Sequence, residues 1–161
     1  MKTLIAIYDT HADAVNALSA LKENHFSMKD VSLLGKAEVI EDHLHIRSFD
    51  KAENTPVLLG TGGGVIAGLL TGIGVFAVPG FGFLYGAGAV IGAIAGFDIG
   101  LVAGGIGSLM TTLGLEEKHT KKVKEHLEKG KYSVLVKGSE DDILKAEKVL
   151  EEEGSHFEIL H

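Results

Sequence analysis

The chain has 161 residues, a net charge of −7, no cysteine and no tryptophan. Its length suits one domain, or one domain with a large insertion, and the lack of cysteine excludes a disulfide framework, thiolate chemistry and a zinc–cysteine site. An acidic chain without a basic tail also argues against a nucleic-acid-binding protein.

The first 50 residues predict a strand, a helix and a second strand. Leu4–Tyr8 is a short apolar run of strand-favouring residues. Thr10, with Asp13 three residues later, resembles a capping box and marks the start of a helix. Val31–Gly35 is predicted to form the second strand, because apolar and polar residues alternate there. The expected apolar stripe of the helix consists of Ala14, Val15, Leu18 and Leu21.

Two further features of the N-terminal part concern the residues after the second strand and the cellular location of the protein. Residues 37–49 predict an extra hairpin with an acidic turn at Glu41-Asp42, and residues 50–56 form a polar linker. The apolar run after Met1 is too short for a secretory signal peptide. We therefore expect the polar part of the protein to lie in the cytoplasm.

An apolar, glycine-rich segment follows at residues 57–114. Most of the 22 glycines lie in it, and Asp98 is its only charged residue. The glycines do not recur every third residue, which excludes a collagen helix. Val57–Val78 and Phe83–Leu113, joined at Pro79–Gly82, predict a helical hairpin with arms of roughly 33 and 46 Å. The first arm matches the hydrocarbon core of a bilayer, which is about 30 Å thick.

Glycines recur at every fourth residue along both predicted helices, and residues four apart share one helix face. Each row leaves a groove without side chains in which another helix can lie, as in small-xxx-small membrane pairs. Glycine costs about 1 kcal/mol per helical residue relative to alanine, so the rows need cover from lipid or from other subunits. The candidate helix-packing residues are Gly60, Gly64, Gly68, Gly72, Gly88, Gly92, Gly96, Gly100 and Gly104.

Two arrangements of this segment stay open. Lys118, Lys121, Lys122 and Lys124 follow the second predicted helix, whereas the turn at Pro79 is uncharged, and this placement fits the positive-inside rule. We therefore expect a homo-oligomer in contact with membrane lipid, with the α/β domain in the cytoplasm. The alternative is a cytoplasmic oligomer or shell without membrane contact, in which hairpins of many subunits bury one another.

Asp98 is the candidate polar site within the apolar segment. A carboxylate at mid-depth in a bilayer costs about 2.5–3.5 kcal/mol on insertion scales, so it has to face a partner helix or water, or stay protonated. One interpretation is a proton or ion site. The other is a local end of the apolar core, where Asp98 hydrogen-bonds to backbone or reaches water.

Residues 115–161 predict one more helix and a second strand–helix–strand unit. The first helix covers Glu116–Lys129, and Gly130 is a typical C′ residue after it. The remaining expected elements are a strand at Tyr132–Val136, a helix at Glu140–Glu153 capped by Ser139 and ended by Gly154, and a strand at residues 157–159.

The element order outside the apolar segment is β-α-β followed by β-α-β. This order is typical of an α+β fold, the ferredoxin-like split β-α-β sandwich, with a four-stranded antiparallel sheet and two helices on one face. The predicted organisation is a first half at residues 1–50, an inserted glycine-zipper helical hairpin at 57–114, and a helix plus second half at 115–161.

Catalytic and cofactor motifs are weak in this sequence. Gly62-x-Gly64-x-x-Ala67 matches a dinucleotide fingerprint, but no acidic residue follows at the distance that the ribose contact needs. Histidines at 43, 45, 119 and 126 are candidate metal ligands, although their spacings are generic and a metal site needs three or four convergent ligands. We therefore predict no enzyme activity, no cofactor, no small-molecule substrate and no assigned metal site.

The layout as a whole resembles the bacterial general-stress (heat-induced stress) protein family, in which a small α/β domain flanks a glycine-rich apolar hairpin. The residues that carry the resemblance are the opening Leu4–Asp9, the turn Val78–Gly82, and the exit from Gly114–Glu117 through a charged helix to Lys129–Val136. The resemblance implies a non-enzymatic, stress-linked protein. The same layout also looks like a small membrane subunit of a bacterial respiratory complex.

Overall fold

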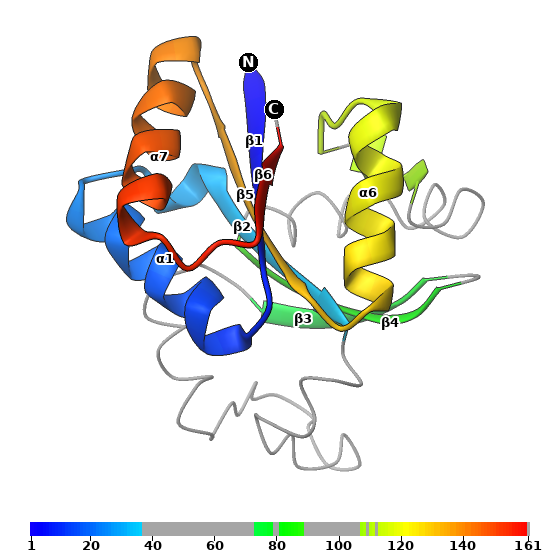
Figure 1. The fold of residues 1–161 in the computed structure, drawn as a ribbon. Helices are drawn as coiled ribbons and strands as arrows, with labels where there is room; N and C mark the ends of the chain where they lie inside the picture. Colours follow the sequence, from blue (N-terminus) through cyan, green and yellow to red (C-terminus); the bar gives the residue numbers. More distant parts are fainter. Residues whose placement is uncertain (37–72, 79–80, 89–106, 109, 112, 161) are drawn as a thin grey trace, which may run out of the picture.

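The computed structural model describes residues 1–36, 73–78, 81–88, 107–108, 110–111 and 113–160. Within these residues the chain has an α+β architecture (Figure 1). The strands are β1 (Lys2–Tyr8), β2 (Val31–Lys36), β3 (Ile73–Val78), β4 (Gly82–Gly88), β5 (Tyr132–Gly138) and β6 (Glu158–Leu160). The α-helices are α1 (His11–Glu23), α6 (Glu117–Glu128) and α7 (Glu140–Glu153), and a short 3-10 helix covers Met28–Asp30.

All six strands belong to one sheet, in the order β3-β4-β2-β5-β1-β6. Every neighbouring pair is antiparallel, with Ile5 opposite Leu135 in β1–β5 and Leu33 opposite Val134 in β2–β5. The strand–helix–strand units are interleaved, because β5 lies between β1 and β2 while β1 lies between β5 and β6. The two halves of the chain therefore cannot form separate sheets.

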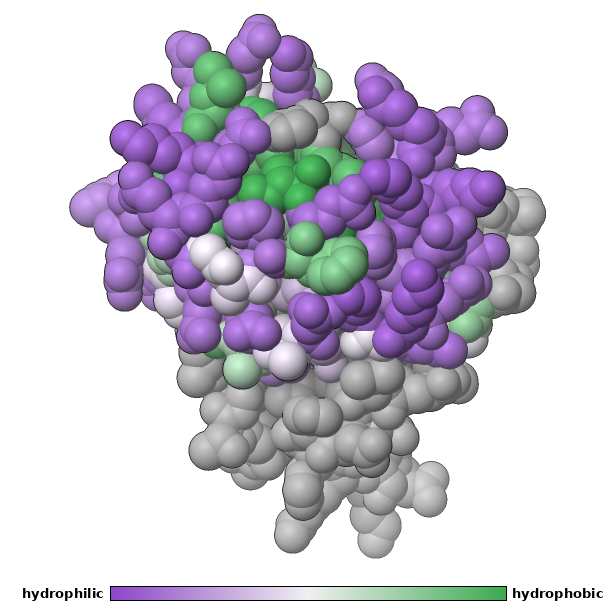
Figure 2. Space-filling view, viewed as in Figure 1, coloured by the Kyte–Doolittle hydropathy of each residue, from purple (hydrophilic) through white to green (hydrophobic). Residues whose placement is uncertain are grey.

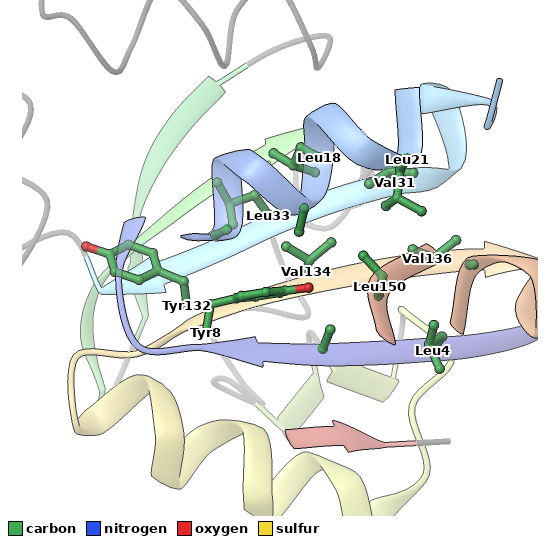
Figure 3. Packing of buried hydrophobic residues seen from close by; sticks show 14 of the residues in the cluster. Leu4, Tyr8, Leu18, Leu21, Val31, Leu33, Tyr132, Val134, Val136 and Leu150 are labelled. Carbon is green, nitrogen blue, oxygen red and sulfur yellow. The ribbon is translucent and has the colours of Figure 1, made fainter. Parts of the chain in front are cut away.

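Helices cover both faces of the sheet, and the strands are apolar on both sides for that reason. On one face, α1 and α7 pack over Leu4, Ala6 and Tyr8 of β1 in a core that Figure 3 shows from close by. On the other face, Ile5 and Ile7 join a second cluster with residues of α6 and of the segment that precedes it. The four-stranded sheet with two helices on one face was thus an incomplete prediction.

The local signals for the helix ends are confirmed. The Thr10 hydroxyl accepts a hydrogen bond from the Asp13 amide at 3.1 Å. Ser139 and Asp142 form a complete capping box at the start of α7. Gly130 and Gly154 follow α6 and α7 with positive φ angles of 79° and 77°, the left-handed conformation that glycine adopts without a Cβ clash.

The predicted helical hairpin is wrong at residues 73–78 and 82–88, whereas residues 107–108 and 110–111, near the end of its second arm, are helical as predicted. Residues 73–78 and 82–88 form the β-hairpin β3–β4, which is added to the sheet beside β2. The turn was predicted at the right place, but Val78 pairs with Gly82 across it, so it joins strands instead of helices. β3 contains Ile73, Val75, Phe76 and Val78, which favour the extended backbone, and β4 contributes the aromatic residues Phe83 and Tyr85.

Other predictions fall beyond the described residues. These are the hairpin at 37–49, the polar linker, and the parts of the apolar segment at 57–72 and 89–106. No helix in the part of the chain that the structure describes has both the length and the apolar character needed to span a bilayer.

Candidate functional site

The predicted site residues are only partly within the described structure. The residues outside it include Asp98, His43 and His45. Eight of the nine candidate helix-packing glycines also lie outside it: Gly60, Gly64, Gly68, Gly72, Gly92, Gly96, Gly100 and Gly104. Gly88 is described, and it ends β4 with a φ of +84°. A Cβ at that position would collide with the carbonyl oxygen of Val31 in β2. In this structure Gly88 therefore permits close strand pairing and does not line a helix groove.

His119 and His126 both lie on α6, as predicted, but they face different surroundings. His119 lines a hollow beside the start of α6, and His126 is buried near the end of the helix. Among the described residues no group of three or more histidine and carboxylate side chains converges as a metal site would require.

Among the strands that the structure describes, the two at the ends of the sheet differ sharply in length and charge. β3, at one edge, has six residues with the sequence Ile-Gly-Val-Phe-Ala-Val and no charged side chain. β6, at the other edge, has three residues and begins with Glu158. Short, charged edge strands resist pairing with another chain, whereas long, apolar ones invite it. The structure thus makes β3 the candidate contact edge, a role that helix-based interpretation of the sequence missed.

An ion pair and a histidine contact hold the short edge strand β6 against α6. Glu158 accepts hydrogen bonds from Lys122 Nζ at 2.6 Å and lies 3.1 Å from His126 Nε2. The hydrogen bond from Lys122 is the main cause that lowers the pKa of the Glu158 carboxyl, and the contact with His126 acts in the same direction. Glu158 therefore carries its negative charge at neutral pH and serves as the partner of both side chains.

Phe157 extends this cluster toward the loop between α6 and β5. Its ring lies edge-on to the His126 ring, with 5.5 Å between the ring centres, and Lys131 Nζ lies 3.5 Å from the centre of the Phe157 ring. Lys131 also pairs with Asp9 after β1. The cluster therefore joins three parts of the chain and acts as a structural clamp.

The three tyrosines of the chain form one row across the sheet, which the sequence analysis did not foresee. Tyr8 of β1 lies opposite Tyr132 of β5, and Tyr85 of β4 lies opposite Gly35 of β2. Because Leu34 of β2 pairs with Ser133 of β5, the next residue of β2, Gly35, lies beside Tyr132. The ring of His11, from α1, lies edge-on to Tyr132 at 5.4 Å and to Tyr85 at 6.5 Å between ring centres. Only the strand register brings these residues together.

Burial is the main cause that raises the pKa of all three tyrosines, so they stay protonated at neutral pH. The hydroxyls of Tyr8 and Tyr85 are buried and find no hydrogen-bond partner among the residues that the structure describes. In Figure 3 the Tyr8 hydroxyl points into the core, whereas that of Tyr132 points away from it. The three tyrosine side chains are therefore packed core residues and not activated phenols.

Comparison with known proteins adds no relative: no family model, no curated protein and no solved structure matches the chain. The family resemblance of the layout therefore stays a prediction, and the functional argument depends on the geometry of the sheet and its edges.

Proposed function

We propose that this is a non-enzymatic, stress-type protein that self-associates, and that the apolar edge strand β3 forms the contact between copies. The observation that carries the proposal is the position of Ile73–Val78 at the end of the sheet. Unsatisfied backbone groups on an uncharged edge strand can pair with the same strand of a second copy. A two-fold axis beside β3 would join two six-stranded sheets into one.

The proposed scaffold is ferredoxin-like, with β3–β4 as an additional hairpin. Its support is the order β2-β5-β1-β6, in which each strand–helix–strand unit is split by a strand of the other. The additional hairpin extends this order beyond β2, because β4 pairs with β2 and β3 pairs with β4.

The remaining glycine rows, at 57–72 and 89–106, supply the second part of the proposed assembly. Membrane lipid is one proposed cover for them, with the α/β domain on the cytoplasmic side. The alternative is a cytoplasmic oligomer whose subunits cover one another. The pairing of β3–β4 with β2 favours this alternative, because residues 73–88 belong to the sheet and do not lengthen an apolar helix.

The test of the edge is a charge placed on β3. We expect Val75→Lys and Phe76→Lys each to lower the mass of the purified protein, measured by light scattering, from an oligomer toward a monomer. Asn16→Lys, on the exposed surface of α1, is the control with the same charge change and should leave the mass unaltered. An oligomer of unchanged mass in both β3 variants would refute the role of this edge.

Two further measurements separate the parts of the proposal. Gly92→Leu with Gly96→Leu should reduce cross-linked oligomers if the glycine rows take part in assembly. Flotation after carbonate extraction distinguishes the two covers, since a lipid-embedded segment carries the protein upward with the vesicles and an oligomer without membrane contact stays below.

A further inference from the structure

The strand registers fix which neighbour the backbone groups of each residue face. Along a β-strand, successive residues direct their N–H and C=O to alternate sides, so each residue bonds to only one of its two neighbouring strands. The carbonyl of Ile7 in β1 accepts a hydrogen bond from the amide of Phe157, which comes just before β6. The odd-numbered residues of β1 therefore face β6, and its even-numbered residues face β5.

This alternation passes from strand to strand across the sheet. Even-numbered residues of β5 pair with even-numbered residues of β1, so odd-numbered ones such as Ser133 face β2. Ser133 pairs with Leu34, which leaves the odd-numbered residues of β2, such as Gly35, to face β4. Gly35 pairs with Tyr85, so the even-numbered residues of β4, such as Leu84, face β3.

The last step reaches the outer side of β3. Leu84 pairs with Phe76, so the even-numbered residues of β3 bond to β4. The carbonyl of Val31, an odd-numbered residue of β2, agrees with the alternation, because a Cβ at Gly88 of β4 would meet it. The odd-numbered residues of β3 therefore direct their N–H and C=O away from β4, and these are Ile73, Val75 and Ala77.

Charge makes this edge the place where two copies of the acidic chain can approach. The net charge of −7 makes copies repel one another, and Figure 2 shows hydrophilic residues over most of the described surface in that view. Among the described strands only β3 and β4 carry no charged side chain, and β4 is paired on both sides. β3 lies two strand spacings, about 10 Å, from the Lys36-bearing strand β2, which exceeds the Debye length of about 8 Å at physiological ionic strength.

We propose that β3 pairs with β3 of a second copy in one antiparallel register, in which the two Val75 residues lie opposite each other on the two-fold axis. This inference rests on the proposed self-association and specifies its geometry. Ile73 then lies opposite Ala77 of the partner subunit, and each outward-facing residue exchanges two hydrogen bonds with the residue opposite. An axis at Gly74 or Phe76 leaves one outward-facing residue without a partner in β3. An axis midway between two residues sets outward-facing residues against residues that already bond to β4.

Single cysteines test this register, because the chain has no cysteine and any disulfide must join two copies. Val75→Cys should form a disulfide-linked dimer on mild oxidation, since the two Cα atoms lie about 5.5 Å apart in such a pair. Ile73→Cys alone should not, because its two copies lie about 14 Å apart along the strands. A mixture of Ile73→Cys and Ala77→Cys should form the mixed dimer, identified by mass spectrometry. Asn16→Cys, on the exposed surface of α1, measures random cross-linking and should react about tenfold or more slowly than Val75→Cys.

Amide hydrogen exchange tests the alternation within β3 itself. In the wild-type oligomer the amides of Val75 and Gly74 should both exchange slowly. In Phe76→Lys, the variant expected to be monomeric, exchange at Val75 should become fast, whereas Gly74 should stay slow because it bonds to Gly86 of β4. A slow Val75 amide in the monomer overturns the proposal, because another part of the same chain then pairs with β3.

The outcomes separate this register from the proposed function on which it rests. A wild-type protein that is a monomer by light scattering refutes both. An oligomer that Phe76→Lys dissociates, but in which Val75→Cys fails to cross-link or Ile73→Cys cross-links with itself, refutes the register and leaves the role of β3 standing. Cross-linking at Val75 and in the Ile73–Ala77 mixture, with a fast Val75 amide in the monomer, establishes the register.

Discussion

His126 Nε2 lies 3.1 Å from Glu158 Oε2 and joins the last turn of α6 to the edge strand β6. The His126 ring also packs edge-on against Phe157, the residue before β6. Lys122 completes the cluster from one turn earlier on the same helix. The three side chains fix the position of β6, which its short ladder with β1 alone would hold weakly.

Replacement of Glu158 by Gln should therefore destabilise the protein by up to about 1 kcal/mol at neutral pH, the scale of a well-formed partly exposed ion pair. The pKa of Glu158 is lowered in the folded state. Its contribution is present above the pKa of the unfolded carboxyl and is lost as the pH falls through the lower folded pKa. Urea unfolding at several pH values should show the stability gap between wild type and Glu158→Gln at pH 7 and its closure in acid. A gap that widens in acid would contradict this account.

Gly88→Ala should destabilise the protein by more than about 1 kcal/mol, because its φ is +84° and a Cβ would meet the Val31 carbonyl. If Gly88 lay inside a helix, Gly88→Ala would instead stabilise the protein by about 1 kcal/mol. Gly107→Ala is the matched control, since a Cβ at Gly107 has no neighbour within 4 Å. Thermal unfolding of both variants decides the matter, and a stabilised Gly88→Ala protein would restore the helical interpretation.

Tyr8→Phe removes a buried hydroxyl that has no partner in the described part of the chain. The change should be neutral or stabilising by up to about 1 kcal/mol, because burial of an unpaired hydroxyl costs free energy. Its measurement is the free energy of unfolding in urea. A loss of more than about 1 kcal/mol would mean that this hydroxyl has a stabilising partner.

Alkaline titration should separate the folded from the unfolded protein. Burial raises the pKa of Tyr8 and Tyr85 above that of a free tyrosine, which is about 10. Their contribution to stability is complete below that value and declines at higher pH, because the unfolded chain ionises first. Phenolate absorbance should therefore rise together with the loss of circular dichroism, and ionisation well before unfolding would show that these rings are accessible.

Ser139→Ala should cost about 1 kcal/mol, the usual value of an N-cap. The Ser139 hydroxyl accepts from the Asp142 amide, and the Asp142 carboxylate accepts from the Ser139 amide in return. Thr120→Ala, in the first turn of α6, is a suitable control because its hydroxyl only donates back to the carbonyl of Glu116. Equal effects of the two changes on urea midpoints would show that the capping box is not what stabilises α7.

The sequence predicted those parts of the fold that local chemistry determines. Thr10 and Ser139 marked helix starts, and Gly130 and Gly154 marked helix ends, because caps depend on a few neighbouring residues. Residues 73–88 were misread because they form an uncharged, apolar stretch between two rows of fourfold-spaced glycines, and those rows favoured a continuous helix on each side of the turn. The deciding partner, β2, is distant in the sequence. The tyrosine row depends on strand register, which no local pattern encodes.

The central position of β5 has a consequence for synthesis of the protein. β1 and β2 both pair with β5, which begins only at Tyr132. On the ribosome, β1, α1 and β2 emerge long before the strand that joins them, and the apolar hairpin β3–β4 follows in the same interval. Until β5 is synthesised, the nascent chain therefore exposes apolar, unpaired strands that are prone to aggregate, and chaperones reduce such aggregation. A cell that makes this protein in quantity needs chaperone capacity at the moment of its translation.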